Sequence, residues 1–323
     1  MATSVPSITE TWTGKIREVT LGATAADGGT RGSALTVGGE STLPFMDMEG
    51  EIPNAPAVGV EITDDKPDDW SPVLLEAWGD VVTDVAEWAA KAEEVGAQFI
   101  ALSLNSAHPE AGNTGAAEAK KTVRAVLEAT TLPLVIYGPG TVEKDNEVLV
   151  AAAEEAAGER VALGNCEDKN YRTIVAAALA HNQLVIARTP IDVNLAKQLN
   201  ILISDMRLPL ERILMDPTTG ALGYGLEYTY SVMERLKLAA LTGDGMTQQP
   251  MIVTVGYEAW RAKETRVNEG IPDAWGDWAK RAYMWETMTA TTLIESGANM
   301  LVLRHPDAVS RMKSVIDKLM GVS

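Results

Sequence analysis

Eight short runs of almost wholly apolar residues recur along the chain, and a longer stretch of helical periodicity follows each of them. A run that is apolar at nearly every position predicts a strand buried on both faces, as in a parallel sheet. The runs are AVGVEI (57–62), FIALSL (99–104), LPLVIYG (132–138), VALGNC (161–166), QLVIART (183–189), RILMDPT (212–218), PMIVTVG (250–256) and NMLVLRH (299–305).

The intervening segments place apolar side chains at helical spacing. Helices are predicted over residues 116–130, 192–206, 228–241, 278–296 and 306–320. Eight strand–helix units between residues 57 and 320 predict an α/β fold of the (β/α)8 TIM barrel class. An open doubly wound sheet also alternates strands and helices, but it often has a GxGxxG motif after the first strand. Here TDDKPDDW (63–70) stands at that place.

Residues 1–56 stand outside this repeat and predict a separate N-terminal β-hairpin extension, followed by the barrel over residues 57–323. KIREVTLG (15–22) and SALTVGGE (33–40) alternate as strands around the turn AADGGTRG (25–32). The hairpin is expected to plug the amino end of the barrel. Alternatively, residues 28–31 approach a ligand or a partner. Residues 70–80 are expected to form an ordered loop.

Charge and cysteine content exclude several classes of protein. The net charge of −18 argues against a nucleic-acid-binding surface. The single cysteine, Cys166, excludes an internal disulfide, a cysteine-rich zinc site and an iron–sulfur cluster in this chain. No apolar run approaches the ~18 residues of a membrane span, and no signal peptide is recognised at the N-terminus. We therefore expect a cytoplasmic protein without membrane contacts.

Barrel enzymes carry their sites at the carboxyl ends of the strands, where this chain places several polar residues. Those residues are Glu61, Asn105, Asn165, Arg188, Asp216, Arg304 and His305, with Tyr137 at the third strand and Gly256, Tyr257 and Glu258 at the seventh. Few of them are placed to act as a base. The glycine- and tyrosine-rich loop 216–235, with Gly223, Tyr224 and Gly225, predicts either a compact cover for the mouth or a platform for a large planar ligand.

Several long segments resemble one family closely. They are VTLGATAADGGTR, VGGESTLPFMDMEGE, VEKDNEVL, KQLNILI, MDPTTGALGYGLEYTYSVMER, VGYEAWRAKE and RHPDAV, in this order over residues 19–309. The family is the small subunit of the corrinoid/iron–sulfur protein, also called the delta-type subunit of acetyl-CoA decarbonylase/synthase.

The resemblance implies a TIM barrel paired with a large subunit that holds cobalamin and a [4Fe–4S] cluster. Such a heterodimer takes a methyl group from methyltetrahydrofolate through a methyltransferase and passes it to acetyl-CoA synthase. The pathway is the reductive acetyl-CoA (Wood–Ljungdahl) pathway of carbon fixation in anaerobes. The barrel mouth would cover the cobalamin without catalytic residues or metal ligands of its own. From their place at the strand ends and in the loops that follow, the residues predicted to face the cofactor are Asn105, Asn165, Arg188, Asp216, Gly223, Tyr224, Gly225, Glu258 and Arg304.

A weaker likeness to pterin-binding barrels supplies an alternative. Those barrels place an Asn at the end of strand four and an Asp at the end of strand six, where this chain has Asn165 and Asp216. They usually add an Asn or Lys at the end of strand seven, where this chain has Gly256. The alternative is a methyltetrahydrofolate-binding methyltransferase that acts on a corrinoid protein. A purely structural barrel is a third possibility.

Overall fold

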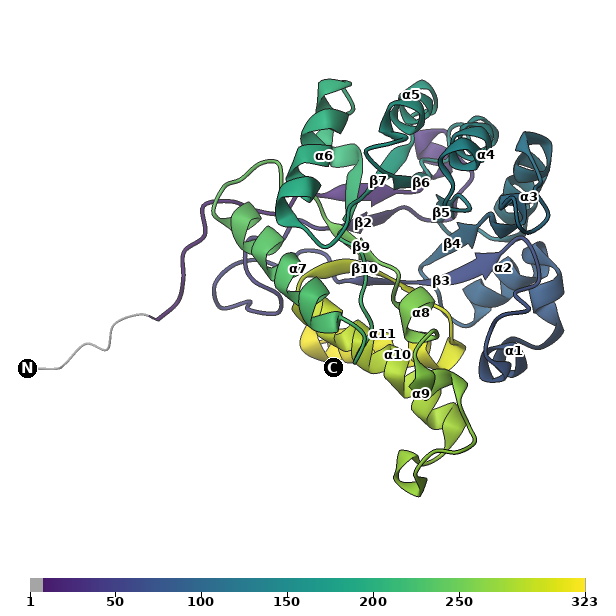
Figure 1. Cartoon of the computed structure of the whole chain (residues 1–323). Coiled ribbons are helices and arrows are strands. Elements are labelled where there is room, and N and C mark those ends of the chain that lie inside the picture. The colour runs from purple at the N-terminus through teal and green to yellow at the C-terminus, as the bar shows by residue number, and fades with distance from the viewer. Residues whose placement is uncertain (1–7, 323) are drawn as a thin grey trace, which may run out of the picture.

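Eight parallel strands close into a barrel in the computed structural model of the chain, which describes residues 8–322 (Figure 1). Each strand pairs with the next in the chain, and the last pairs with the first. The strands are β3 (Ala57–Thr63), β4 (Phe99–Ser103), β5 (Leu134–Tyr137), β6 (Ala162–Cys166), β7 (Leu184–Arg188), β8 (Ile213–Asp216), β9 (Met251–Val253) and β10 (Ala298–Leu303). The predicted TIM barrel and its eight strands are confirmed.

Helices surround the barrel, as Figure 1 shows. They are α1 (Pro72–Trp78), α2 (Val85–Glu94), α3 (Ala116–Ala129), α4 (Val142–Glu155), α5 (Tyr171–His181), α6 (Val193–Asp205), α7 (Leu226–Leu241), α8 (Val255–Ala259), α9 (Lys263–Arg266), α10 (Trp278–Glu295) and α11 (Pro306–Leu319). The Asp192 side chain caps α6 by accepting hydrogen bonds from the backbone N–H groups of Asn194 and Leu195.

Two local predictions are wrong. Residues 70–80 are not a loop throughout, because α1 occupies most of them and has Pro72 in its first turn, where a missing N–H group is harmless. The seventh strand ends at Val253 rather than extending to residue 256, because helix α8 begins at Val255. This early helix start brings Gly256 against the end of the neighbouring strand β10, with consequences described below.

A short hairpin closes the amino end of the barrel. Its strands β1 (Val19–Leu21) and β2 (Leu35–Val37) are antiparallel and shorter than predicted, because Gly22 and Gly38 turn the chain with positive φ angles of 85°. Val19, Leu21 and Val37 are buried with the side chains that fill the barrel interior. The hairpin therefore acts as the expected plug. Residues 1–7 lie outside the described part of the chain. The start of the predicted extension, and the N-terminus at which no signal peptide is recognised, fall on these residues.

Arg31 ties this hairpin to the barrel. Its guanidinium is buried, forms an ion pair with Glu159 at 2.9 Å and donates hydrogen bonds to the backbone carbonyls of Thr130 and Leu127 at 2.7 Å each. These contacts engage the Arg31 side chain within the protein. The structure therefore favours a role of residues 28–31 in holding the hairpin plug in place over an approach to a ligand or a partner. Within residues 8–322, no helix is long and apolar enough to cross a membrane.

Candidate functional site

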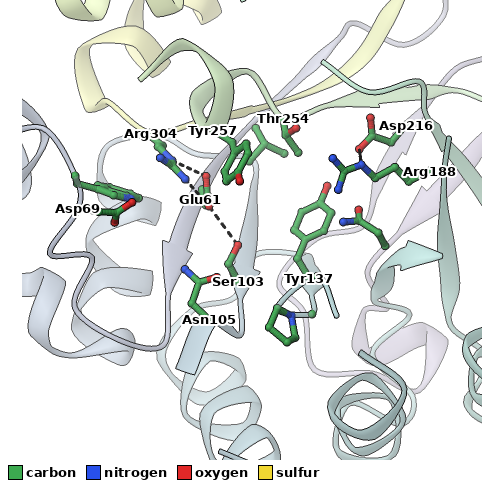
Figure 2. A pocket seen from close by; sticks show the side chains of 16 residues that line it. Glu61, Asp69, Ser103, Asn105, Tyr137, Arg188, Asp216, Thr254, Tyr257 and Arg304 are labelled. Carbon is green, nitrogen blue, oxygen red and sulfur yellow. Dashed lines mark hydrogen bonds and ion pairs between the residues drawn. The ribbon is translucent and has the colours of Figure 1, made fainter. Parts of the chain in front are cut away.

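A polar cavity of about 230 Å³ opens at the carboxyl ends of the barrel strands (Figure 2). Because the strands are parallel, the final residues of all eight meet at this end. Glu61 of β3, Asn165 of β6, Arg188 of β7 and Asp216 of β8 line the cavity, together with Arg304, which follows β10. We call this space the mouth cavity.

Five of the nine predicted cofactor-facing residues line the mouth cavity, namely Asn105, Asn165, Arg188, Asp216 and Arg304. The lining residues outside the predicted cofactor-facing set include Asp69, Trp70 and Tyr257. Asp69 and Trp70 lie between β3 and α1, and Trp70 covers Arg304. Such a segment has no periodicity, so the sequence offers little signal for its position.

The other four predicted residues, Gly223, Tyr224, Gly225 and Glu258, lie outside the lining of the mouth cavity. The loop that carries the first three is held against α9 and α10. The Tyr224 hydroxyl donates to Glu264 Oε2 and accepts from the backbone N–H of Lys263, both at 3.1 Å. Trp285 of α10 donates from its indole N–H to the carbonyl of Leu222 at 3.1 Å.

Arg304 occupies one side of the mouth cavity and forms an ion pair with Glu61. It donates from Nε to Glu61 Oε2 at 2.7 Å and from Nη2 to Glu61 Oε1 at 3.0 Å. Its guanidinium carbon lies 4.5 Å from the ring centre of Trp70 and 5.3 Å from that of Tyr257. Burial by itself would lower the pKa of Arg304, but the charge and hydrogen bonds of Glu61, together with the charge of Glu286, outweigh it and the pKa is raised. This side therefore presents a neutralised pair between aromatic rings.

Gly256 is required by this arrangement. A Cβ atom at residue 256 would lie 2.7 Å from Arg304 Cγ, 2.9 Å from Arg304 N and 3.0 Å from Glu286 Oε1. Glu286 is buried beneath the cavity, where it accepts hydrogen bonds from the backbone N–H groups of Arg304 and His305, and burial raises its pKa to about 7. The space that an Asn or Lys side chain would need is thus already filled.

The opposite side of the mouth cavity is incompletely paired. Asp216 is buried, and this burial raises its pKa to about 6. It accepts a hydrogen bond from the backbone N–H of Thr218 at 2.9 Å, but Arg188 Nε lies 3.9 Å from its Oδ2. Tyr137 Oη and Asn165 Oδ1 are buried and have no hydrogen-bond partner within the described residues. Burial, to a greater extent than the nearby charge of Asp216, raises the pKa of Tyr137.

A wider groove of about 590 Å³ adjoins this side and shares Arg188 with the mouth cavity. Residues after β6, β7 and β8 form its polar wall, and Leu195, Leu199 and Leu202 of α6 form its apolar wall. Leu195 belongs to this apolar wall, yet its side chain is 43% exposed. The helix therefore leaves part of its apolar face open beside Arg188.

Neither histidine nor cysteine supplies a ligand to the mouth cavity. Of the three histidines, all within the described residues, none lines it. His305 caps α11 by accepting from the backbone N–H of Asp307, and burial lowers its pKa to about 4. Burial raises the pKa of the Cys166 thiol. Over residues 8–322, no three His, Cys, Asp or Glu side chains are grouped so as to hold a metal ion.

The family model described as "CO dehydrogenase/acetyl-CoA synthase delta subunit" matches residues 18–316. The acetyl-CoA decarbonylase/synthase complex subunit delta of Archaeoglobus fulgidus is 38% identical over 320 residues, which is 97% of this chain and 70% of that protein. Subunit delta 1 of Methanosarcina thermophila is 39% identical, over 96% of this chain and 72% of its own length.

Solved structures with a similar fold include dihydropteroate synthases. The enzyme from Xanthomonas albilineans with 4-aminobenzoic acid has a TM-score of 0.57 and 14% identity, over 83% of this chain and 94% of that one. The Coxiella burnetii enzyme in complex with pteroic acid has a TM-score of 0.55 and 13% identity, over 87% and 99% of the two chains. At this identity the likeness establishes the shared barrel fold alone.

Proposed function

The chain belongs to the CO dehydrogenase/acetyl-CoA synthase delta subunit family, and from this premise we propose that it is the small subunit of a heterodimeric corrinoid/iron–sulfur methyl carrier. In this proposal its mouth covers the cobalamin that a large subunit holds. A methyltetrahydrofolate:corrinoid methyltransferase and acetyl-CoA synthase dock in turn as transient partners. The assembly works in the reductive acetyl-CoA pathway, in the cytoplasm of an anaerobe.

The observation that carries the proposal is the make-up of the mouth. Arg304 is neutralised by Glu61, and no imidazole or thiol lines the mouth cavity among the described residues. A surface of this kind can lie over a corrin without offering a competing axial ligand. When bound, cobalamin would supply the methyl-carrying metal centre, while the protein would contribute orientation and exclusion of water. Tyr257, 44% exposed and in contact with the guanidinium groups of Arg304 and Arg261, would contribute an aromatic side chain at the rim.

The iron–sulfur cluster belongs to the partner in this proposal. A [4Fe–4S] cluster is held by four thiolates, and the chain has one cysteine. That cysteine, Cys166, is fully buried, and burial favours its neutral thiol. The cluster ligands must therefore come from the large subunit.

The alternative function, a methyltransferase that binds methyltetrahydrofolate itself, rests on Asn165 and Asp216, which both line the mouth cavity. The packing around Gly256 opposes it. A pterin site built on buried hydrogen bonds loses affinity steeply when one partner is missing, and here Arg304 and Glu286 fill the place of that partner. We expect no demethylation of methyltetrahydrofolate by the isolated chain, even with free cob(I)alamin supplied.

The buried thiol of Cys166 makes a site-specific labelling test possible, because an introduced surface cysteine is then the reactive one. Tyr257→Cys places a thiol at the mouth, and Met48→Cys places one in the N-terminal extension, where Met48 is 71% exposed. Maleimide labelling is followed with and without the cobalamin-loaded large subunit. We expect the large subunit to slow labelling at residue 257 by about tenfold or more while leaving residue 48 unchanged. Equal rates at residue 257 in both conditions would contradict the proposal.

A further inference from the structure

Building on the proposed function, we propose that Tyr137, Asn165, Arg188 and Asp216 form a subsite for a neutral carboxamide group. In the assembled protein this group would be one peripheral amide arm of the corrinoid. The arm would enter the mouth cavity while the macrocycle stays at the rim. We call these four residues the amide subsite.

The first argument is unsatisfied hydrogen bonding. Buried polar atoms in folded proteins almost always have a partner. Tyr137 Oη and Asn165 Oδ1 have none among residues 8–322, and the 3.9 Å separation of Arg188 and Asp216 is too long for a hydrogen bond. Arg304 on the other side of the cavity is paired twice with Glu61. Among the described residues that line the cavity, the buried polar atoms without a hydrogen-bond partner thus lie on one side. This indicates a binding place for a polar ligand group.

The second argument is the kind of group that matches. Figure 2 shows the Tyr137 hydroxyl, Arg188 and Asp216 pointing toward one another at this side of the cavity. A carboxamide has a carbonyl oxygen that can accept from Tyr137 or Arg188, and an NH₂ group that can donate to Asp216. A carboxylate would face the charge of Asp216, and a cation would face Arg188. A neutral group with both a donor and an acceptor can form hydrogen bonds with the Tyr137 hydroxyl, Arg188 and Asp216 without placing like charges together.

The third argument is size. At ~30 Å³ for each water, the 230 Å³ of the mouth cavity equals about seven or eight water molecules. A propionamide arm of about five non-hydrogen atoms fits this space with room for ordered water, whereas a corrin macrocycle does not. The pyrimidinone edge of a pterin carries the same N–H and C=O pair. An experiment is therefore needed to distinguish a corrinoid amide arm from a pterin as the group that binds here.

The experiment uses cyanocobalamin and its b-, d- and e-monocarboxylic acids, in each of which one propionamide is replaced by a propionate. Each corrinoid is loaded into the large subunit, and the dissociation constant of the full chain for the loaded subunit is measured by titration calorimetry at pH 8. Asp216 is ionised at this pH, because its pKa is about 6. We expect one of the three acids to weaken assembly about tenfold or more, since it loses a donor and sets a carboxylate against Asp216.

Asp216→Asn should restore assembly with that same acid to within about threefold of the amide parent, because an Asn side chain can donate to a carboxylate. Glu295→Gln, the same type of change at the exposed end of α10 remote from the mouth, should restore nothing. Tyr137→Phe removes only the unpartnered hydroxyl and should weaken binding of the amide form several-fold. The amide subsite is refuted if all three acids give the same dissociation constant as cyanocobalamin, or if Asp216→Asn fails to restore assembly. Either result leaves the proposed function intact.

A different result would separate the two sources. If the chain fails to assemble with the cobalamin-loaded large subunit but binds methyltetrahydrofolate, and loses that binding in Asp216→Leu, the subsite recognises the amide of a pterin. The proposed function then falls while the amide subsite stands. If neither assembly nor pterin binding is found, both are refuted.

Discussion

Gly256→Ala tests the packing that, in the proposed function, opposes pterin binding at the mouth of the barrel. The new methyl group would lie 2.7 Å from Arg304 Cγ and 2.9 Å from Arg304 N, where ordinary contacts begin near 3.4 Å. The backbone atom cannot retreat, and the Arg304 side chain is held by two hydrogen bonds to Glu61. Overpacking of this kind costs about 1–3 kcal/mol, and replacing Gly by Ala in a helix returns ~0.5–1 kcal/mol. We expect a net loss of about 1–2 kcal/mol.

Thermal unfolding followed by circular dichroism measures this loss. At the ~2–4 °C per kcal/mol typical of large domains, the melting temperature should fall by roughly 2–8 °C. Gly245→Ala is the matched control, because a Cβ there meets its nearest atom, Arg17 Nη2, at an ordinary 3.7 Å. Gly256→Asn, which restores the side chain usual in pterin barrels, should lose more stability and gain no pterin binding. A Gly256→Ala protein as stable as the Gly245→Ala protein would refute the reasoning.

Three further predictions follow from buried groups. Lys237→Met should lower the free energy of unfolding by about 3–5 kcal/mol, because it leaves the carboxylate of Glu40 buried without its ion-pair partner. Adding Glu40→Gln should recover much of this loss, as measured by urea titration. His305 has a folded pKa of about 4, below the usual ~6.5, so the stability from its neutral form is complete above pH 6.5 and is lost as the pH falls toward 4. His305→Asn keeps a capping oxygen and should reduce the acid-induced loss between pH 7 and pH 4.5 by roughly 2–3 kcal/mol, and an unchanged pH profile would contradict this. Cys166 should not react with Ellman's reagent in the native protein and should give one thiol per chain in urea, whereas rapid native reaction would show that the thiol is accessible.

The parts of the site that lie at strand ends were predictable from the sequence. Asn165, Arg188, Asp216 and Arg304 follow directly from the eight apolar runs, because parallel strands bring their carboxyl ends together. The positions of residues carried by irregular segments relative to the mouth cavity were less predictable. Tyr224 follows β8 in the sequence, but its hydroxyl bonds to α9 and lies outside the mouth cavity. Trp70 lines the cavity from a segment without periodicity.

The sequence by itself determined the architecture and the family. Apolar runs of strand length, separated by helical stretches, admit few folds, because each run must be buried on both faces. Long motifs over most of the chain determine the family in the same way, since they depend on residue order alone. Net charge and the cysteine count, which excluded classes of function, are also properties of composition and need no coordinates.

Only the tertiary structure decided which polar groups are paired. Glu61 and Arg304 are 243 positions apart, and their mutual neutralisation depends on β3 and β10 meeting where the barrel closes. The same closure leaves Tyr137 and Asn165 unpartnered and fills the space beside Gly256. Pairing and free volume depend on distances between residues far apart in the chain, which the order of residues does not contain.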